Sequence, residues 1–253
     1  MTYKSLFISD IHLGLRHTNL GVLMEVLKNN EFENLFLVGD IIDGWKLRRK
    51  FEWTELENRF LQKVFKLARK GVHVKYIIGN HDEFMYSFDG QTFGGIEVCE
   101  KYTHETTCGE KLLLIHGHQF DGIVKCNKWL QKIGAFLYEY LIAANVQFNI
   151  LRHKMGFGYW SLSKYLKAKT KEAVNYVSNF EETLINYAQK SGADGIVAGH
   201  IHTPKVLIGP IGYYNCGDFV ENSSYLVERL DGRIELIEVQ SGVLGSSPER
   251  VDP

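Results

Sequence analysis

Five short blocks of the sequence combine aspartate, asparagine and histidine at close spacing. Carboxylate, imidazole and amide groups together suit a borderline-hard divalent metal such as Mn²⁺, Fe²⁺ or Zn²⁺ better than Ca²⁺ or a thiolate zinc site. We therefore expect the blocks to form a divalent-metal site. In chain order they are Asp10-Ile11-His12, Gly39-Asp40, Gly79-Asn80-His81-Asp82, His116-Gly117-His118 and Gly199-His200-Ile201-His202.

Each block ends a short apolar run that has the length of a buried strand. The runs are residues 4–10, 34–40, 72–80, 111–117 and 193–200. Helical patterns at 20–28 and 53–68 separate the first three runs, and Gly71 is a plausible helix stop. Alternating strands and helices predict βαβ units and a mainly parallel sheet, in which ligands bind at the carboxyl ends of the strands.

The spacing within the blocks also favours a shared centre. Alternate residues of an extended segment point the same way, so Asp10 with His12, and His200 with His202, can reach one point. Glycines beside the blocks, at 39, 79, 117 and 199, let the backbone approach that point closely. Helix capping could explain one such Asp or Asn, but not six polar groups at aligned strand ends.

In this order, the blocks resemble the signature of the calcineurin-like metallophosphoesterases: D-x-H, G-D, G-N-H-D, an H-G-x block and G-H-x-H. The resemblance covers most of the chain. It implies an α/β fold, a sandwich of βαβ-built sheets flanked by helices. Two further strands are expected at 205–214 and 225–239, the second with a hairpin turn at Asp231-Gly232.

The resemblance also implies roles for individual residues. One metal would be held by Asp10, His12, Asp40 and His202, and the other by Asp40, Asn80, His116 and His200, with Asp40 as the bridge. His81 would donate to the leaving oxygen or stabilise the transition state, with Asp82 orienting it. Asp43 is expected either to cap the next segment or to hydrogen-bond a ligand.

Within this superfamily, the chain size and the second block, Gly39-Asp40-Ile41-Ile42-Asp43-Gly44-Trp45, resemble the UDP-2,3-diacylglucosamine pyrophosphatases of lipid A biosynthesis and their relatives. The resemblance implies that metal-activated hydroxide, with Mn²⁺ the expected metal, hydrolyses the pyrophosphate of an acylated nucleotide-sugar. His81 stands where those enzymes typically have arginine. A phosphodiesterase or phosphatase acting on another nucleotide or a phospholipid-like substrate would therefore show the same blocks. A non-catalytic metal-binding scaffold is the alternative of another class, and the complete ligand set with His81 argues against it.

A long segment at about residues 121–191 shows no strand pattern. We expect it to be a helical insertion, broken near 156–158, within a single domain spanning residues 1–253. It holds ten basic and five acidic residues together with many aromatics, so it would attract an anionic substrate. We therefore expect it to form a lid or wall of the site. The candidate substrate contacts are His118, Asp121, Lys125, Lys128 and Arg152.

Composition excludes several other classes of protein. Hydrophobic residues make up 45% and charged residues 23% of the chain, which is typical of a globular domain. The formal net charge of −1 gives no reason to expect nucleic acid as a partner. The sequence shows no secretory signal and no apolar run of the roughly 20 residues that span a bilayer. We therefore expect at most peripheral contact with the inner membrane. Four cysteines without C-x-x-C spacing favour a cytoplasmic location.

Overall fold

The computed structural model describes residues 1–16, 18–121 and 162–239, with side chains from residue 176 onward in the last range. The chain divides into two units. One consists of Met1–His118 with Leu184–Pro253, and the other of Gln119–Thr183. Among the described helices, none is long and apolar enough to cross a membrane.

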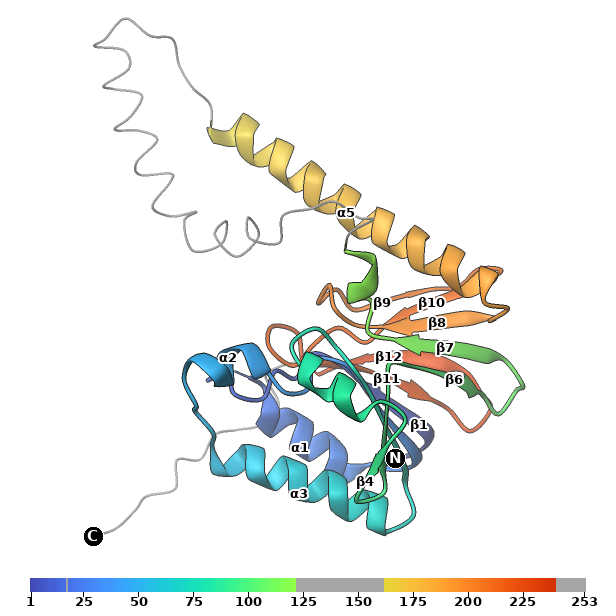
Figure 1. Cartoon of the computed structure of the whole chain (residues 1–253). Helices are drawn as coiled ribbons and strands as arrows, with labels where there is room; N and C mark the ends of the chain where they lie inside the picture. The colour runs from blue at the N-terminus through green and yellow to red at the C-terminus, as the bar shows by residue number, and fades with distance from the viewer. Residues whose placement is uncertain (17, 122–161, 240–253) are drawn as a thin grey trace, which may run out of the picture. The chain divides into compact units, whose positions relative to one another are not determined.

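The larger sheet of the first unit has seven strands in the order β12-β11-β1-β2-β3-β5-β4 (Figure 1). Its parallel centre consists of β1 (Thr2–Ile8), β2 (Glu31–Val38), β3 (His73–Ile77) and β5 (Ile96–Cys99). Antiparallel strands flank this centre, namely β11 (Ser224–Glu228), β12 (Ile234–Glu238) and β4 (Thr92–Phe93). The carboxyl ends of β1, β2 and β3 therefore lie at one edge, as the βαβ pattern predicted.

The smaller sheet has five strands in the order β6-β7-β8-β10-β9. They are β6 (Lys101–Glu105), β7 (Lys111–Ile115), β8 (Gly195–Ala198), β9 (Lys205–Leu207) and β10 (Gly212–Asn215). Strands β7, β8 and β10 are parallel, and β6 and β9 are antiparallel to their neighbours. The sequence predicted one strand at 205–214. The chain instead reverses after Leu207, so that β9 and β10 pair with each other.

Helices α1 (Leu20–Asn29) and α3 (Glu55–Arg69) confirm the two predicted helical patterns. Thr54 and Glu57 form a capping box at the start of α3, and Gly71, with φ of 93°, follows its end. Helix α5 (Leu162–Lys190) agrees with the helical expectation for the insertion, whereas the break expected near 156–158 lies outside the described residues. Three short helices were not predicted: α2 (Gly44–Arg49), η1 (Glu83–Phe88) and η2 (His118–Phe120).

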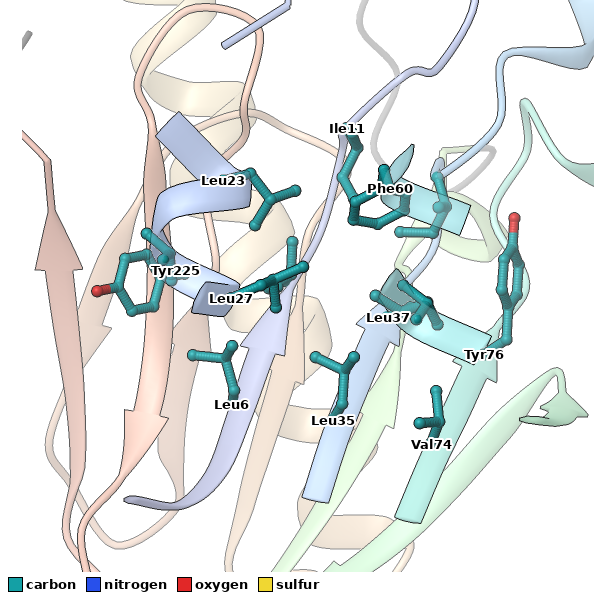
Figure 2. Packing of buried hydrophobic residues seen from close by; sticks show 14 of the residues in the cluster. Leu6, Ile11, Leu23, Leu27, Leu35, Leu37, Phe60, Val74, Tyr76 and Tyr225 are labelled. Atoms are coloured by element: carbon teal, nitrogen blue, oxygen red, sulfur yellow. The ribbon is translucent and has the colours of Figure 1, made fainter. Parts of the chain in front are cut away.

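Successive residues of the central strands alternate between two apolar layers. Leu6 of β1 and Leu35 of β2 lie in one layer with Phe60 of α3 (Figure 2). Phe7 and Phe36, on the opposite face, stack with their ring centroids 4.9 Å apart and belong to the layer shared with the smaller sheet. The first unit is therefore an α/β sandwich, as expected, and both faces of its larger sheet are packed. Such packing holds the strand ends in fixed positions.

Candidate metal centre

The five polar blocks come directly after the carboxyl ends of five parallel strands. Three blocks follow β1, β2 and β3 of the larger sheet, and two follow β7 and β8 of the smaller sheet. Backbone hydrogen bonds join neighbouring blocks, since Asp10 N–H donates to the Gly39 carbonyl at 3.1 Å and Gly199 N–H donates to the His116 carbonyl at 3.1 Å. The two sheets thus bring the blocks together at one edge of the sandwich.

The backbone of these blocks adopts a conformation that side chains other than glycine rarely accept. Among the described residues, six non-glycine residues have positive φ, and five of these belong to the blocks. The five values run from 51° to 72°, each with a strain on the order of 1–3 kcal/mol. The packed sandwich must therefore impose the turns that aim the polar side chains. The five residues are Asp10, His12, Asp40, His200 and His202.

Asp10, His12 and His202 form the first cluster of potential ligands, with one ligand atom of each lying within 4.8 Å of the others. Asp10 Oδ1 is 3.1 Å from His202 Nε2 and 3.7 Å from His12 Nε2. The second carboxylate oxygen of Asp10 accepts a hydrogen bond from the backbone N–H of His200 at 2.9 Å. One oxygen of Asp10 is thus fixed by the backbone, and the other faces the imidazoles.

Asp40, His116 and His200 form the second cluster. The Nδ1 atom of His116 donates to the Val38 carbonyl at 2.9 Å, which leaves Nε2 directed at Asp40 Oδ2, 3.2 Å away. The same Asp40 oxygen lies 3.7 Å from His12 Nε2 of the first cluster. Asp40 therefore lies between the two clusters.

Four of the candidate ligand atoms are buried with no hydrogen-bond partner among the described residues: Asp10 Oδ1, His12 Nε2, Asn80 Oδ1 and His116 Nε2. Leaving one buried polar atom unsatisfied costs about 1–3 kcal/mol, so four within the polar blocks require an explanation. A divalent cation accepts carboxylate, amide and imidazole donors alike. The donor set therefore fits a metal centre.

The charges of the site are matched to one another. Burial opposes ionisation of Asp10 and Asp40, but the surrounding imidazoles outweigh it and hold the pKa of both carboxyls below the usual range. Burial likewise opposes protonation of His12, yet Asp10 and Asp43 raise its pKa to about 10. In the same way, Asp40 and Asp10 outweigh burial and raise the pKa of His116 to about 9. A metal bound here would therefore displace protons.

Asp43, three residues after Asp40, contacts two of the histidines. Its Oδ2 is 3.3 Å from His12 Nδ1, and its Oδ1 is 3.1 Å from His81 Nδ1. Asp43 Oδ1 also accepts a hydrogen bond from the backbone N–H of Lys46 at 2.8 Å, which caps α2. Asp43 thus has both of the roles that the sequence left open, because it caps a helix and orients an imidazole that faces the site.

The carboxylate beside His81 is that of Asp43 and not that of Asp82, which the sequence had suggested. Asp82 is fully buried, and its Oδ2 accepts a hydrogen bond from the Gly79 N–H at 3.1 Å. Burial and the nearby charge of Asp40 raise the pKa of Asp82 to about 7. The difference arises because Asp82 precedes η1 and turns into the interior, away from the imidazole before it.

Three of the glycines are required where the strands end. A Cβ atom at Gly39 would overlap the His116 ring, one at Gly79 would overlap Asp40, and one at Gly199 would overlap Ser9 and Asp10. The expectation that the backbone crowds the site at these three glycines is confirmed.

The expected substrate contacts have different surroundings. His118 Nε2 lies 3.0 Å from the Tyr86 hydroxyl. Asp121, in the second unit, accepts a hydrogen bond from the Tyr176 hydroxyl at 3.2 Å. Lys125, Lys128 and Arg152 lie outside the described residues.

One neighbour of the site, Trp45, ends the segment that carries the resemblance but was given no role from the sequence. The Trp45 ring lies 4.2 Å from the His81 ring, measured between centroids, and its Nε1 donates to Glu83 Oε1 at 3.3 Å. Its position two residues after Asp43, at the start of α2, was the available signal.

Comparison with known proteins gives the following similarities. A family model described as calcineurin-like phosphoesterase matches residues 3–204. A UDP-2,3-diacylglucosamine hydrolase of Psychromonas ingrahamii is 26% identical over 246 residues, covering 92% of this chain and 96% of the relative. A protein of the same name from Aliivibrio fischeri is 28% identical over 217 residues, covering 79% of this chain and 81% of the relative. Among solved structures, vacuolar protein sorting 29 from Cryptosporidium parvum aligns with a TM-score of 0.46 at 13% identity, covering 93% of this chain and 95% of that one.

Proposed function

Because this chain belongs to the calcineurin-like phosphoesterase family, whose members are metal-dependent phosphohydrolases, we propose that it hydrolyses the phosphoanhydride of an acylated nucleotide-sugar of the UDP-2,3-diacylglucosamine type. The observation that carries the proposal is the set of buried, unpartnered ligand atoms grouped around Asp40. The names of the two relatives support the choice of substrate.

In this proposal, two divalent cations, with Mn²⁺ the preferred metal, share Asp40. The first is held by Asp10, His12, Asp40 and His202, and the second by Asp40, Asn80, His116 and His200. When bound, such a pair activates a water for attack on phosphorus and offsets charge on the phosphoryl oxygens. The chain's own contribution is to fix each ligand from behind, as the Val38 carbonyl does for His116 and Asp43 for His12.

His81 is the residue that we assign to the leaving group. Its Nε2 lies 4.0 Å from Asp40 Oδ2, and its side chain keeps 19% exposure where that of Asp40 keeps 3%. A substrate can therefore reach His81 while Asp40 behind it stays shielded. With Asp43 against Nδ1, the imidazole presents Nε2 to the site, where it can give a proton to the departing oxygen or stabilise charge on it.

We assign binding of the parts of the substrate outside the scissile phosphoanhydride to the insertion at about residues 121–191. Its excess of basic residues supports binding of the nucleotide phosphates, and its aromatic residues support binding of acyl chains. The proposed contacts are Asp121, Lys125, Lys128 and Arg152. An acylated substrate also supports the proposal that the protein is cytoplasmic and contacts the inner membrane peripherally.

The test is reconstitution with Mn²⁺ followed by assay with UDP-2,3-diacylglucosamine and with an unacylated UDP-sugar. We expect two metals per chain and release of UMP, with the acylated compound the better substrate. Each buried methylene contributes roughly 0.8 kcal/mol, so extending the acyl chains should raise kcat/KM until the apolar site is full. Equal rates on the two compounds would contradict the assignment of an acylated substrate, while the assignment as a phosphohydrolase would stand. Two bound metals without turnover of any phosphoester would indicate a scaffold.

A further inference from the structure

His118 lies at the metal centre without belonging to either ligand cluster. Its ring centroid is 5.6 Å from that of His116 and 6.2 Å from that of His200. Both neighbours are members of the second cluster. A group bound at that cluster is therefore within reach of the His118 imidazole.

Tyr86 fixes the position of this imidazole. The Tyr86 hydroxyl lies 3.0 Å from His118 Nε2, and the two rings meet edge to face with their centroids 6.4 Å apart. Tyr86 belongs to η1, which begins directly after Asp82 at the end of the third block. The helix that follows the third block therefore supports a side chain of the fourth block. Burial and the acidic residues nearby raise the pKa of Tyr86, which keeps its hydroxyl protonated and able to donate.

His81 has a similar arrangement at the first cluster. Its ring lies 4.5 Å from that of His12, and Asp43 is placed against its Nδ1. Each cluster thus has one further imidazole beside it, with a polar side chain from another part of the chain placed against it. The partner of His81 is a carboxylate, whereas the partner of His118 is a neutral hydroxyl. The two imidazoles are therefore suited to different tasks, namely proton donation for His81 and binding for His118.

We propose that Tyr86 and His118 form a phosphate-binding pair, in which His118 contacts a phosphoryl oxygen of the substrate beside the second cluster and Tyr86 is a positioning residue. The inference rests on the proposed phosphohydrolase function and adds substrate-binding residues to it. An imidazole has two ring nitrogens, so it can contact the Tyr86 hydroxyl and a phosphoryl oxygen at the same time.

A double-mutant cycle tests this pair in the Mn²⁺-loaded full chain. Tyr86→Phe should raise KM about 3–10-fold, the scale of one hydrogen bond, with kcat changed less than about twofold. His118→Gln should raise KM about 10–100-fold, the scale of a hydrogen bond to a charged group. Because Tyr86 acts through His118, the double variant should match His118→Gln within about twofold. Metal content and melting temperature of each variant should equal those of the wild type.

The matched control is Tyr102→Phe, which removes the hydroxyl from a partly buried tyrosine on β6 that packs against Phe36. It should leave KM unchanged. Independent effects of Tyr86→Phe and His118→Gln, or an effect of Tyr102→Phe as large as that of Tyr86→Phe, would overturn the positioning role.

Binding of inorganic phosphate, measured by calorimetry on the same Mn²⁺-loaded proteins, separates this inference from the proposed function. We expect both variants to lose phosphate affinity by the factors given for KM. If no nucleotide-sugar is hydrolysed but the variants still lose phosphate affinity, the substrate assignment fails and the pair stands. Unchanged phosphate affinity in both variants, or no phosphate binding by the wild type, would overturn the pair.

Discussion

Replacing Asp43 by serine should weaken the metal centre while preserving the helix next to it. The carboxylate contacts His12 Nδ1 and His81 Nδ1, and it also caps α2 through the backbone N–H of Lys46. Serine is a good helix cap but is too short to reach two imidazoles. Asp43→Ser therefore removes the support of the histidines alone, whereas Asp43→Ala removes that support and the cap together.

The expected magnitudes follow from these contacts. Loss of a group that orients a metal ligand typically lowers metal affinity by about 10–100-fold, and His12 loses such a group in both variants. His81 also loses its partner, so the rate at saturating Mn²⁺ should fall by about 10²-fold, the lower end for an acid–base residue. Capping by Asp or Ser contributes about 1 kcal/mol, so Asp43→Ala should unfold more easily than Asp43→Ser by that amount.

Three measurements on each variant decide the matter: Mn²⁺ titration by calorimetry, turnover at saturating Mn²⁺, and urea unfolding of the metal-free protein. Equal functional loss in the serine and alanine variants, with a stability difference between them, is the expected pattern. If Asp43→Ser kept wild-type metal affinity and rate, the contacts with His12 and His81 would have no role, and Asp43 would be a helix cap only.

Further substitutions test other parts of the site and fold. Asp40→Asn should lose both metals and lower activity by several orders of magnitude, because the amide carries no charge to share. Metal analysis and turnover measure the two losses. His81→Ala should keep both metals but lose about 10²–10⁴-fold in rate, with a smaller loss on p-nitrophenyl esters, whose leaving group needs no proton. Gly199→Ala should prevent metal binding, because its Cβ would overlap Ser9 and Asp10, and the same metal analysis checks this. Burial opposes ionisation of Glu228, but hydrogen bonds from His104, Ser5 and the Thr107 backbone hold its pKa below the usual range. Its carboxylate therefore stabilises the fold above about pH 4.5, and that contribution is lost as pH falls through the lower folded-state pKa. Glu228→Gln should accordingly lower the free energy of unfolding by about 1–3 kcal/mol at pH 7 and by less at pH 3, in urea titrations.

The fold and the meeting of the polar blocks could be predicted because both depend on short-range sequence patterns. Apolar runs the length of a strand marked β1, β2 and β3, and periodic apolar residues marked α1 and α3. Parallel strands present their carboxyl ends at a common edge, so residues as distant as Asp10 and His202 could be grouped without knowledge of the tertiary structure.

What could not be predicted depends on backbone turns and contacts between elements. Sequence adjacency favoured Asp82 as the partner of His81, but consecutive side chains at a turn point apart, and Asp43 arrives from the loop after β2. Aspartate and histidine accept positive φ more often than other non-glycine residues, but residue type does not say which of them adopt it here, because the surrounding packing imposes these values. Tyr86 was missed for a similar reason, since only the course of η1 brings it to His118.

The position of β1 determines when the metal centre can form during synthesis. β1 is made first, yet it lies in the middle of the larger sheet and pairs on one side with β11. The Asp10 carbonyl accepts a hydrogen bond from Phe219 N–H at 3.1 Å, and the side chain of Asp10 faces His202. At about 5–20 residues per second, a ribosome takes on the order of 10–40 s to travel from Asp10 to His202. The ligands that follow β1, β2 and β3, namely Asp10, His12, Asp40 and Asn80, are therefore made before β11 and before the remaining histidine ligands. Metal uptake by the complete centre follows release of the C-terminal strands from the ribosome.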